Sequence, residues 1–148
     1  MTTSRPAPLP EIDIHLAAPL DLADLTQFVA HAGGEAHLHD FAADVTDSEW
    51  FVARADGLPV GLMRLRPTFF RRPFVELLLV RPDHRRRGVG TAMLRHAQQR
   101  HAGTKVYTST NLSNQPAQAL FARCGFRLCG SVDDLDPGDP ELVFVWPG

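Results

Sequence analysis

Hydrophobic residues recur along the first third of the chain at two spacings, one typical of strands and one typical of helices. Between residues 11 and 16 they alternate with polar residues, which predicts a half-buried strand. Between residues 21 and 31 leucine, phenylalanine and valine recur at three- or four-residue intervals, which predicts a helix. Gly33-Gly34 ends this helix, and the polar residues 35–48 are expected to form a short helix or a loop.

The middle of the chain predicts a hairpin, a central strand and a second helix. Two mainly apolar runs between residues 50 and 66 flank Asp56-Gly57, a dipeptide typical of tight hairpin turns. Residues 69–73 are expected to form a loop. The aliphatic run at 77–80 is too short for a helix, so it predicts a buried strand, and the helix formers at 92–98 predict a helix.

The last third of the chain again alternates between strand and helix patterns. A helix is predicted at 115–124, with a proline in the first turn, where proline is tolerated. Together with the earlier elements, this order predicts a single α/β domain of residues 11–148 with a mixed, mostly antiparallel sheet. The proline-rich residues 1–10 are expected to be a flexible leader. The last strands are predicted at 105–110, 126–130 and 142–146.

Composition narrows the class of protein. A chain of 148 residues, 44% of them hydrophobic, is long enough for one domain with a real core. A net charge of −2 argues against general attraction to nucleic acids or membranes, and no apolar run is long enough for a signal peptide or a membrane span. Cys124 and Cys129 have neither metal-binding nor redox spacing, so a cytoplasmic protein with reduced thiols is expected.

Three arginines and two glycines separate the central strand from the helix after it. The glycines let the main chain approach a ligand, the free amides at the start of the helix point toward it, and the arginines add positive charge. This pattern predicts an anion site suited to a diphosphate; the alternative is a solvated basic stretch. A dinucleotide fingerprint would need a third glycine where Met93 stands, and a P-loop would need a Gly-Lys-Ser/Thr sequence that is absent. The stretch comprises Arg85, Arg86, Arg87, Gly88, Val89, Gly90 and Thr91.

Two motifs resemble the GNAT family of N-acetyltransferases. The pattern R-x-x-G-x-G, at residues 85–90, is similar to the acetyl-CoA motif of that family. The pattern N-x-x-A-x-x-L-x-x-x-x-G-F, at residues 114–126, is similar to the helix and strand that complete its coenzyme site. The resemblance covers about residues 50–146. It implies a sheet of six or seven strands, about four flanking helices, and a central pair of strands that splay apart.

The resemblance also implies which residues hold acetyl-CoA. Main-chain groups of Leu78, Leu79 and Val80 would bind the pantetheine arm between the splayed strands, as an added strand would be bound. The arginine–glycine stretch would bind the phosphates, and Asn114 would form a side-chain hydrogen bond with pantetheine. The alternatives are an ordinary core strand for the aliphatic run and a helix cap for Asn114.

An attacking amine must lose a proton, because a lysine-like amine is almost entirely protonated at pH 7. Glu76, just ahead of the aliphatic run, is the candidate base; the alternative is a glutamate in solvent or paired with Arg64 or Arg66. Where the family often carries a tyrosine acid near the departing sulfur, this chain has Phe121. Phe121 is expected to contact the coenzyme, and solvent, Ser113 or Tyr107 would protonate the thiolate. Tyr107 is alternatively an ordinary strand residue.

The expected function is transfer of an acetyl group from acetyl-CoA to a primary amine by direct attack. A small-molecule amine is favoured because no acidic groove for basic peptides is evident; a protein N-terminus or lysine is the alternative. A catalytically silent acyl-CoA-binding regulator and a nucleic-acid module using the arginines are competing classes. The acidic residues at 133–141 are expected either to attract a cationic amine or to form a solvated loop. A homodimer is compatible with the sequence.

Histidines and aspartates cluster between the first predicted helix and the hairpin. Their spacing matches no standard zinc site and no cysteine joins them, so no bound metal is expected. The stretch is expected instead to help shape the acceptor pocket. The residues are His31, His37, His39, Asp40 and Asp44.

Overall fold

The computed structural model describes residues 11–32 and 49–148. Three expectations fall outside the described residues: the leader at 1–10, the helix end at Gly33-Gly34, and the stretch 35–48 with most of the histidine–aspartate cluster. Within the described ranges, no group of histidine, cysteine and acidic side chains is arranged to hold a metal ion. No helix in those ranges is long and apolar enough to cross a membrane.

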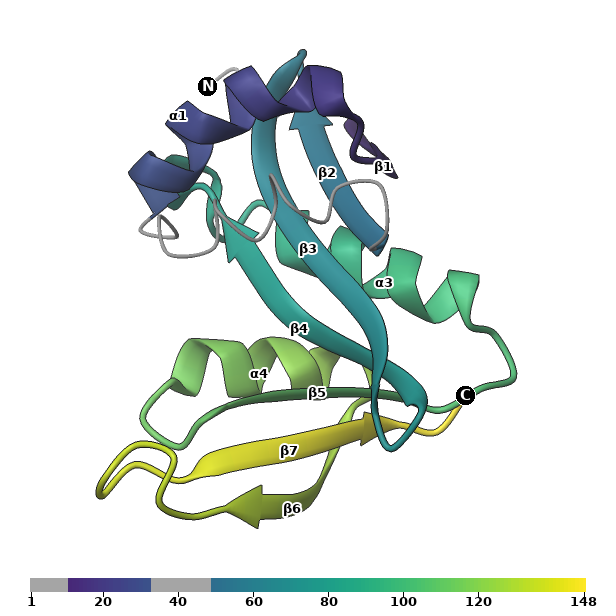
Figure 1. Cartoon of the computed structure of the whole chain (residues 1–148), viewed down its shortest axis with the longest axis vertical. Helices are drawn as coiled ribbons and strands as arrows, with labels where there is room; N and C mark the ends of the chain where they lie inside the picture. Colours follow the sequence, from purple (N-terminus) through teal and green to yellow (C-terminus); the bar gives the residue numbers. More distant parts are fainter. Residues whose placement is uncertain (1–10, 33–48) are drawn as a thin grey trace, which may run out of the picture.

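Seven strands form one mixed sheet in the order β1-β2-β3-β4-β5-β7-β6 (Figure 1). All neighbouring strands are antiparallel except β4 and β5, which are parallel. The strands are β1 Ile12–Leu16, β2 Glu49–Ala55, β3 Leu58–Phe69, β4 Arg72–Val80, β5 Val106–Asn111, β6 Arg127–Val132 and β7 Glu141–Trp146. The α-helices of the described residues are α1 Leu22–Ala32, α3 Val89–Arg100 and α4 Gln115–Arg123.

The central strands β4 and β5 pair over only two positions. Phe74 faces Tyr107 and Val75 faces Thr108, and the strands then diverge (Figure 1). The predicted splayed pair is therefore confirmed. Beyond Val75, one edge of β4 pairs with no strand of the described residues, so its main-chain groups on that side are available to solvent or to a ligand.

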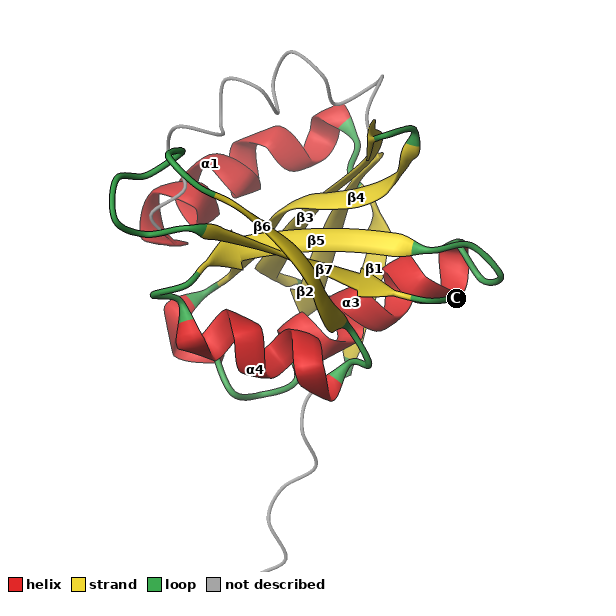
Figure 2. Cartoon of the chain, turned by 90° about the horizontal axis from the view of Figure 1, so that it is seen from below, coloured by secondary structure: helices red, strands yellow, loops and turns green. Residues whose placement is uncertain are grey.

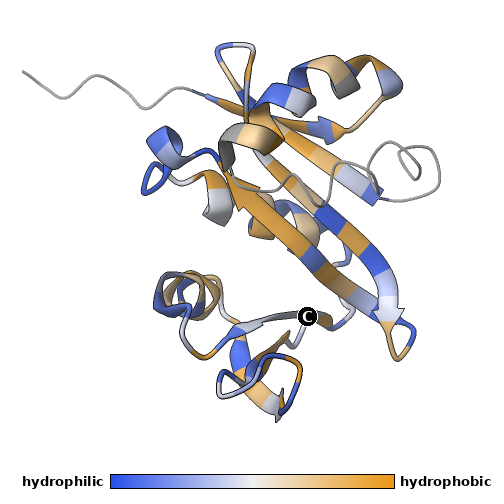
Figure 3. Ribbon diagram, turned by 60° about the vertical axis from the view of Figure 1, so that its left-hand side comes forward, coloured by the Kyte–Doolittle hydropathy of each residue, from blue (hydrophilic) through white to orange (hydrophobic). Residues whose placement is uncertain are grey.

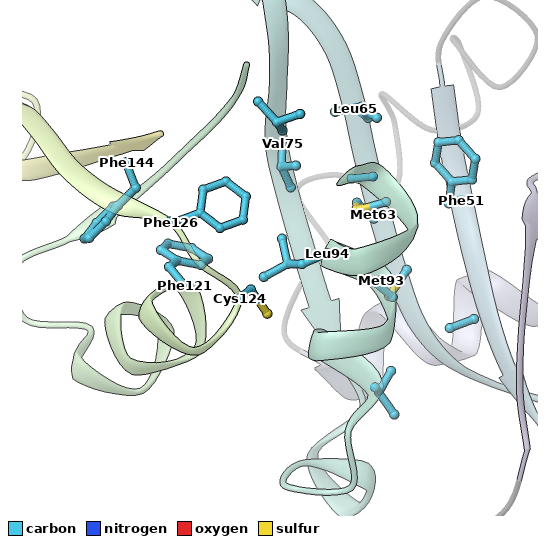
Figure 4. Packing of buried hydrophobic residues seen from close by; sticks show 14 of the residues in the cluster. Phe51, Met63, Leu65, Val75, Met93, Leu94, Phe121, Cys124, Phe126 and Phe144 are labelled. Atoms are coloured by element: carbon cyan, nitrogen blue, oxygen red, sulfur yellow. The ribbon is translucent and has the colours of Figure 1, made fainter. Parts of the chain in front are cut away.

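Helices cover both faces of the sheet, with α1 on one face and α3 and α4 on the other (Figure 2). The larger core cluster lies between the sheet and the pair α3–α4, where Met93 and Leu94 of α3 and Phe121 of α4 are buried (Figure 4). A smaller cluster lies under α1, where Leu25 and Phe28 pack against Trp50. The apolar faces of the predicted helices therefore form the core, as expected from their spacing.

The loop expected at 69–73 is wrong. The structure has a two-residue turn of Phe70 and Arg71, and β4 begins at Arg72. Both turn residues have positive φ, 50° and 64°, which is the geometry of a tight hairpin turn, although neither is the glycine or asparagine that normally marks it. As a result β4 is nine residues long, and Glu76 lies in its middle instead of at its start.

A buried carboxylate ties the start of α1 to the first hairpin. Asp21, which is 8% exposed, accepts hydrogen bonds from the Ala18 amide at 2.8 Å and from Arg54 at 2.7 Å, and His15 lies 3.5 Å away. Burial by itself would raise the pKa of Asp21, but these hydrogen bonds and the nearby positive charge outweigh it and lower that pKa below its ordinary value, 3.8.

Replacing this carboxylate tests its contribution to stability. Because the pKa of Asp21 is lower in the folded state, its stabilising effect is complete above pH 3.8 and is lost as the pH falls through the folded value. We expect Asp21→Asn to lower the free energy of unfolding by about 1–3 kcal/mol at pH 7, and by less below pH 4. Urea unfolding at several pH values measures the loss of stability at pH 7 and the smaller loss below pH 4. Asp13→Asn, at an 80% exposed side chain, is the control; equal losses in the two variants would contradict the prediction.

Candidate functional site

The open edge of β4 lines a gap between the two halves of the sheet. The side chains of Leu78 and Val80 pack into the larger core and those of Leu77 and Leu79 pack under α1, so the aliphatic run is a core strand. Figure 3 shows this end of β4 coloured as hydrophobic. Its residues are nevertheless only half-buried, because β5 has diverged from the strand at this point. The two interpretations of this run are therefore compatible: the side chains form the core and the main chain faces the gap.

A β-bulge places Glu76 at the point where the gap begins. Arg64 of β3 faces Leu77 and Leu65 faces Val75, so Glu76 is the extra residue of β4 and follows the last β4–β5 pair directly. A bulge redirects a side chain and is common next to active sites. Glu76 is an exposed residue, although its side chain is only 24% exposed, so its carboxylate is accessible to solvent.

Two neighbours on β3 hold the Glu76 carboxylate. Thr68 Oγ1 donates to its Oε1 at 2.5 Å, and Arg64 Nε lies 3.6 Å from its Oε2. The Arg64 guanidinium is itself buried, 4.9 Å from the centre of the Trp50 ring. The ion pair with Arg64, one of the alternatives for Glu76, is thus present. It fixes the orientation of the carboxylate.

The glycine stretch forms the first turn of α3. Residues 85–88 are exposed, and Gly88 has φ of +84° at the N-cap of the helix. The first helical hydrogen bond runs from the Ala92 amide to the Gly88 carbonyl at 2.9 Å, so the amides between them have no carbonyl partner within the helix. A Cβ at Gly88 would meet nothing within 4 Å. Glycine is needed here for its left-handed backbone, and the space beside it is open.

The second glycine of the motif has a packing role that the sequence did not reveal. A Cβ at Gly90 would lie 2.9 Å from Cδ2 of Leu120 on α4. Gly90 is buried and lets α3 and α4 approach each other. A close approach of its main chain to a ligand stays a prediction.

A third glycine, Gly61, lets α3 pack closely on the sheet. This role was not predicted from the sequence. A Cβ at Gly61 of β3 would lie 2.6 Å from Sδ of Met93 and 3.0 Å from Cγ1 of Val89. Gly61 therefore determines how closely the first turns of α3, with their free amides, approach β3. A glycine inside a predicted strand is the signal that could have indicated this contact.

Asn114 caps α4, as the alternative interpretation proposed. Its Oδ1 accepts a hydrogen bond from the Ala117 amide at 3.2 Å. Its Nδ2 makes no hydrogen bond to any described residue, and the residue is exposed. The cap and a donated hydrogen bond to a ligand therefore use different atoms of the same amide.

Phe121 and Tyr107 lie on opposite faces of the second half of the sheet. Phe121 is 4% exposed and its ring lies 5.3 Å from that of Phe144, within the core (Figure 4). Tyr107 lies at the closed end of the gap, where its ring is 4.7 Å from that of Phe69. Both residues pack as structural side chains, and no contact with a ligand follows from their positions alone.

The acidic connection between β6 and β7 is bound to the end of β5. Asp136 accepts a hydrogen bond from Asn111 at 2.8 Å, and Asp139 accepts one from the Ser113 hydroxyl at 2.6 Å. The Ser113 proton is therefore engaged, which disfavours Ser113 as a proton donor to a ligand in the gap.

Known proteins share this sequence pattern and this fold. The family model described as the acetyltransferase (GNAT) family matches residues 18–126. The peptidyl-lysine N-acetyltransferase YjaB of Salmonella typhimurium is 29% identical over 100 residues, which are 66% of this chain and 64% of that protein. The streptothricin acetyltransferase of Streptomyces lavendulae is 37% identical over 98 residues, 62% of this chain and 51% of that protein. The matches thus span about half to two thirds of the length of these relatives.

A solved structure matches almost the whole chain. The crystal structure of a GNAT-family acetyltransferase from Bacillus cereus has 28% sequence identity and a TM-score of 0.82, and the match covers 91% of this chain and 96% of that one.

The seating of α3 can be tested with glycine variants. We expect Gly61→Val to lower the free energy of unfolding by about 1–3 kcal/mol, because the new side chain must displace Met93 and Val89. Gly130→Val is a matched control, since a Cβ at Gly130 of β6 would meet nothing within 4 Å. Urea unfolding measures both variants; equal stability would show that β3 and α3 are not in close contact.

Proposed function

The chain belongs to the acetyltransferase (GNAT) family, and we propose that it transfers an acetyl group from acetyl-CoA to a primary amine. The observation that carries this proposal is the open edge of β4 after Val75, which is followed in the chain by the first turn of α3, where the amides before Ala92 have no partner within the helix. An edge of this kind can bind the two amides of an extended pantetheine arm, and a helix N-terminus can bind its diphosphate.

The residues on both sides of the gap fit the coenzyme. The main-chain groups of Leu78, Leu79 and Val80 would bind pantetheine, and the Asn114 Nδ2 would donate to it from the opposite side. The open space beside Gly88 leaves room for phosphate oxygens. The thioester of the bound coenzyme supplies the acetyl group. The residues that would hold the phosphates are Arg85, Arg86, Arg87, Gly88, Val89, Gly90 and Thr91.

Glu76 is the proposed base. A primary amine with a pKa of about 10.4 reaches the site as an ammonium ion and must lose a proton before it can attack. Glu76 would take this proton through a water molecule, with Thr68 and Arg64 holding its carboxylate in place. Phe121 has no proton to give, and a thiolate departs readily because a thiol has a pKa of about 8.5, so a strong acid is dispensable. Tyr107 stays the candidate donor.

A small-molecule amine is the proposed acceptor. The relatives' names cover both an antibiotic and a peptidyl lysine, so the family alone does not choose between them. The acidic connection offers little support for a basic peptide, because Asp136 and Asp139 are engaged by Asn111 and Ser113. Incubation with acetyl-CoA and a mixed set of small amines and lysine peptides, with free thiol and acetylated products measured, tests this. Tight coenzyme binding without thiol release for any amine would favour a silent regulator.

Coenzyme binding by the glycine stretch can be tested by replacing Gly88, with a matched control variant at Gly103, just beyond the other end of α3. Gly88 and Gly103 have φ of +84° and +81°, and a Cβ at either would meet nothing within 4 Å. Valine at either site should therefore cost about 1–2 kcal/mol of backbone strain. Only Gly88→Val should also weaken coenzyme A binding, by about tenfold or more, as measured by calorimetry. Equal affinity in the two variants would remove the stretch from the site.

The pH dependence of kcat/KM can distinguish a catalytic role of Glu76 from a structural role in its ion pair with Arg64. We expect Glu76→Gln to lower kcat by about 10²–10⁴-fold and to flatten the fall of kcat/KM at acid pH, because that fall reports protonation of the base. Glu49→Gln, which removes a carboxylate paired with Arg100 at 3.1 Å, should leave the profile unchanged. A normal acid limb in Glu76→Gln would leave Glu76 with a structural role only.

A further inference from the structure

A second concave site lies beyond the closed end of the β4–β5 gap. It has a volume of about 440 Å³ and is bounded by the β3–β4 turn and by strands β5, β7 and β6. Figure 1 shows this turn beside the end of β7. Phe69 and Phe70 form one side, and Tyr107, Val143 and Val145 form the floor. We call this site the turn hollow.

The turn hollow lies on the face of the sheet opposite α4. The floor residues of β7 alternate with Phe144 and Trp146, which pack into the core beneath α4. Phe69 and Tyr107, which both line the hollow, lie 4.7 Å apart, and Phe69 stacks on Phe74 at 5.4 Å, where β4 and β5 make their last pairs. The hollow therefore borders the closed end of the gap in which the coenzyme is proposed to bind and is distinct from it.

Two cationic side chains border the apolar floor. Lys105 and Arg127 both line the turn hollow, and in the described part of the chain neither forms an ion pair or a side-chain hydrogen bond. Strand register places Arg127 opposite Val145, and Lys105 directly precedes β5, so both lie at the same end of the sheet. The lining includes no acidic residue, although the whole chain has a net charge of −2.

The charges decide which kind of occupant fits. The exposed residues Arg71 and Arg72 of the β3–β4 turn have the same sign as Lys105 and Arg127, so a second copy packing its turn into this site would meet repulsion. The volume is that of a small-molecule site, for which about 300–1,000 Å³ is typical. An apolar floor with unpaired cations at its border favours an organic anion.

We propose that the turn hollow binds a small organic anion with an aromatic or branched aliphatic body and a carboxylate. The body packs on Tyr107, Val143 and Val145, and the carboxylate accepts hydrogen bonds from Lys105 and Arg127. Two kinds of ligand have this chemistry. One is an acceptor amine that also carries a carboxylate, and the other is a separate molecule that binds without being acetylated. Nothing in the binding step depends on acetyl transfer.

The cysteines provide a readout at the site itself. Cys129 is exposed and lines the turn hollow, whereas Cys124 is fully buried. Alkylation of Cys129 by N-ethylmaleimide, followed by mass spectrometry, should slow in the presence of indole-3-acetate, in a saturable manner. Indole-3-acetamide, which has the same body without the charge, should protect about tenfold less well or worse.

Charge-removing variants test the same interaction from the protein side. Lys105→Gln combined with Arg127→Gln should weaken protection by indole-3-acetate about tenfold or more, while Arg123→Gln at the end of α4 should not change it. Circular dichroism and urea unfolding check that each variant is folded. Equal protection by the acid and the amide, absence of protection by the acid, or unchanged protection in the folded double variant would overturn the proposal.

Acetylation distinguishes the two sources. Tryptophan carries both an amine and a carboxylate. If the hollow serves the acceptor, tryptophan or a related amino carboxylate is acetylated, and the double variant raises its KM with kcat unchanged. If the hollow serves a separate molecule, Cys129 is protected and no such compound is acetylated. A protein without any transferase activity would still show the protection, so failure of the proposed function is distinguishable from failure of this site.

Discussion

The short pairing between β4 and β5 is the constraint on which the rest of the structure depends. Two residue pairs hold the strands together at Phe74 and Val75, and beyond them the sheet opens. One continuous core supports both sides of this opening: aromatic rings of Phe121 and Phe144 fill it beneath α4, and Met63 and Met93 fill it beneath α3 (Figure 4). Main-chain groups left without a strand partner need another partner, and an extended amide-bearing ligand can provide one.

Close contacts at glycines fix the position of α3 against the sheet and against α4. Gly61 lets the first turns of the helix approach β3, and Gly90 lets the same helix approach α4. Gly88 has a different task, because its left-handed backbone forms the N-cap of the helix and the space beside it is open. Three glycines therefore determine where the first turn of α3 lies.

The bulge in β4 places the Glu76 carboxylate beside two partners on β3. It is close enough to Arg64 for an ion pair and receives a hydrogen bond from Thr68, so its orientation is fixed. These contacts hold it at the start of the gap, where the proposed reaction needs a base. The pH dependence of that reaction, more than its rate, would report whether this carboxylate takes the proton.

Local sequence determined the elements and part of the site. Alternation and helical spacing identified the strands and helices, Asp56-Gly57 identified the first turn, and the glycine stretch and Asn114 identified two helix starts, because each depends on neighbours a few residues away. Only the tertiary structure decided the bulge at Glu76, the contact of Gly61 with Met93 and the turn hollow. These depend on the register and packing of segments distant in the sequence, which no local pattern encodes.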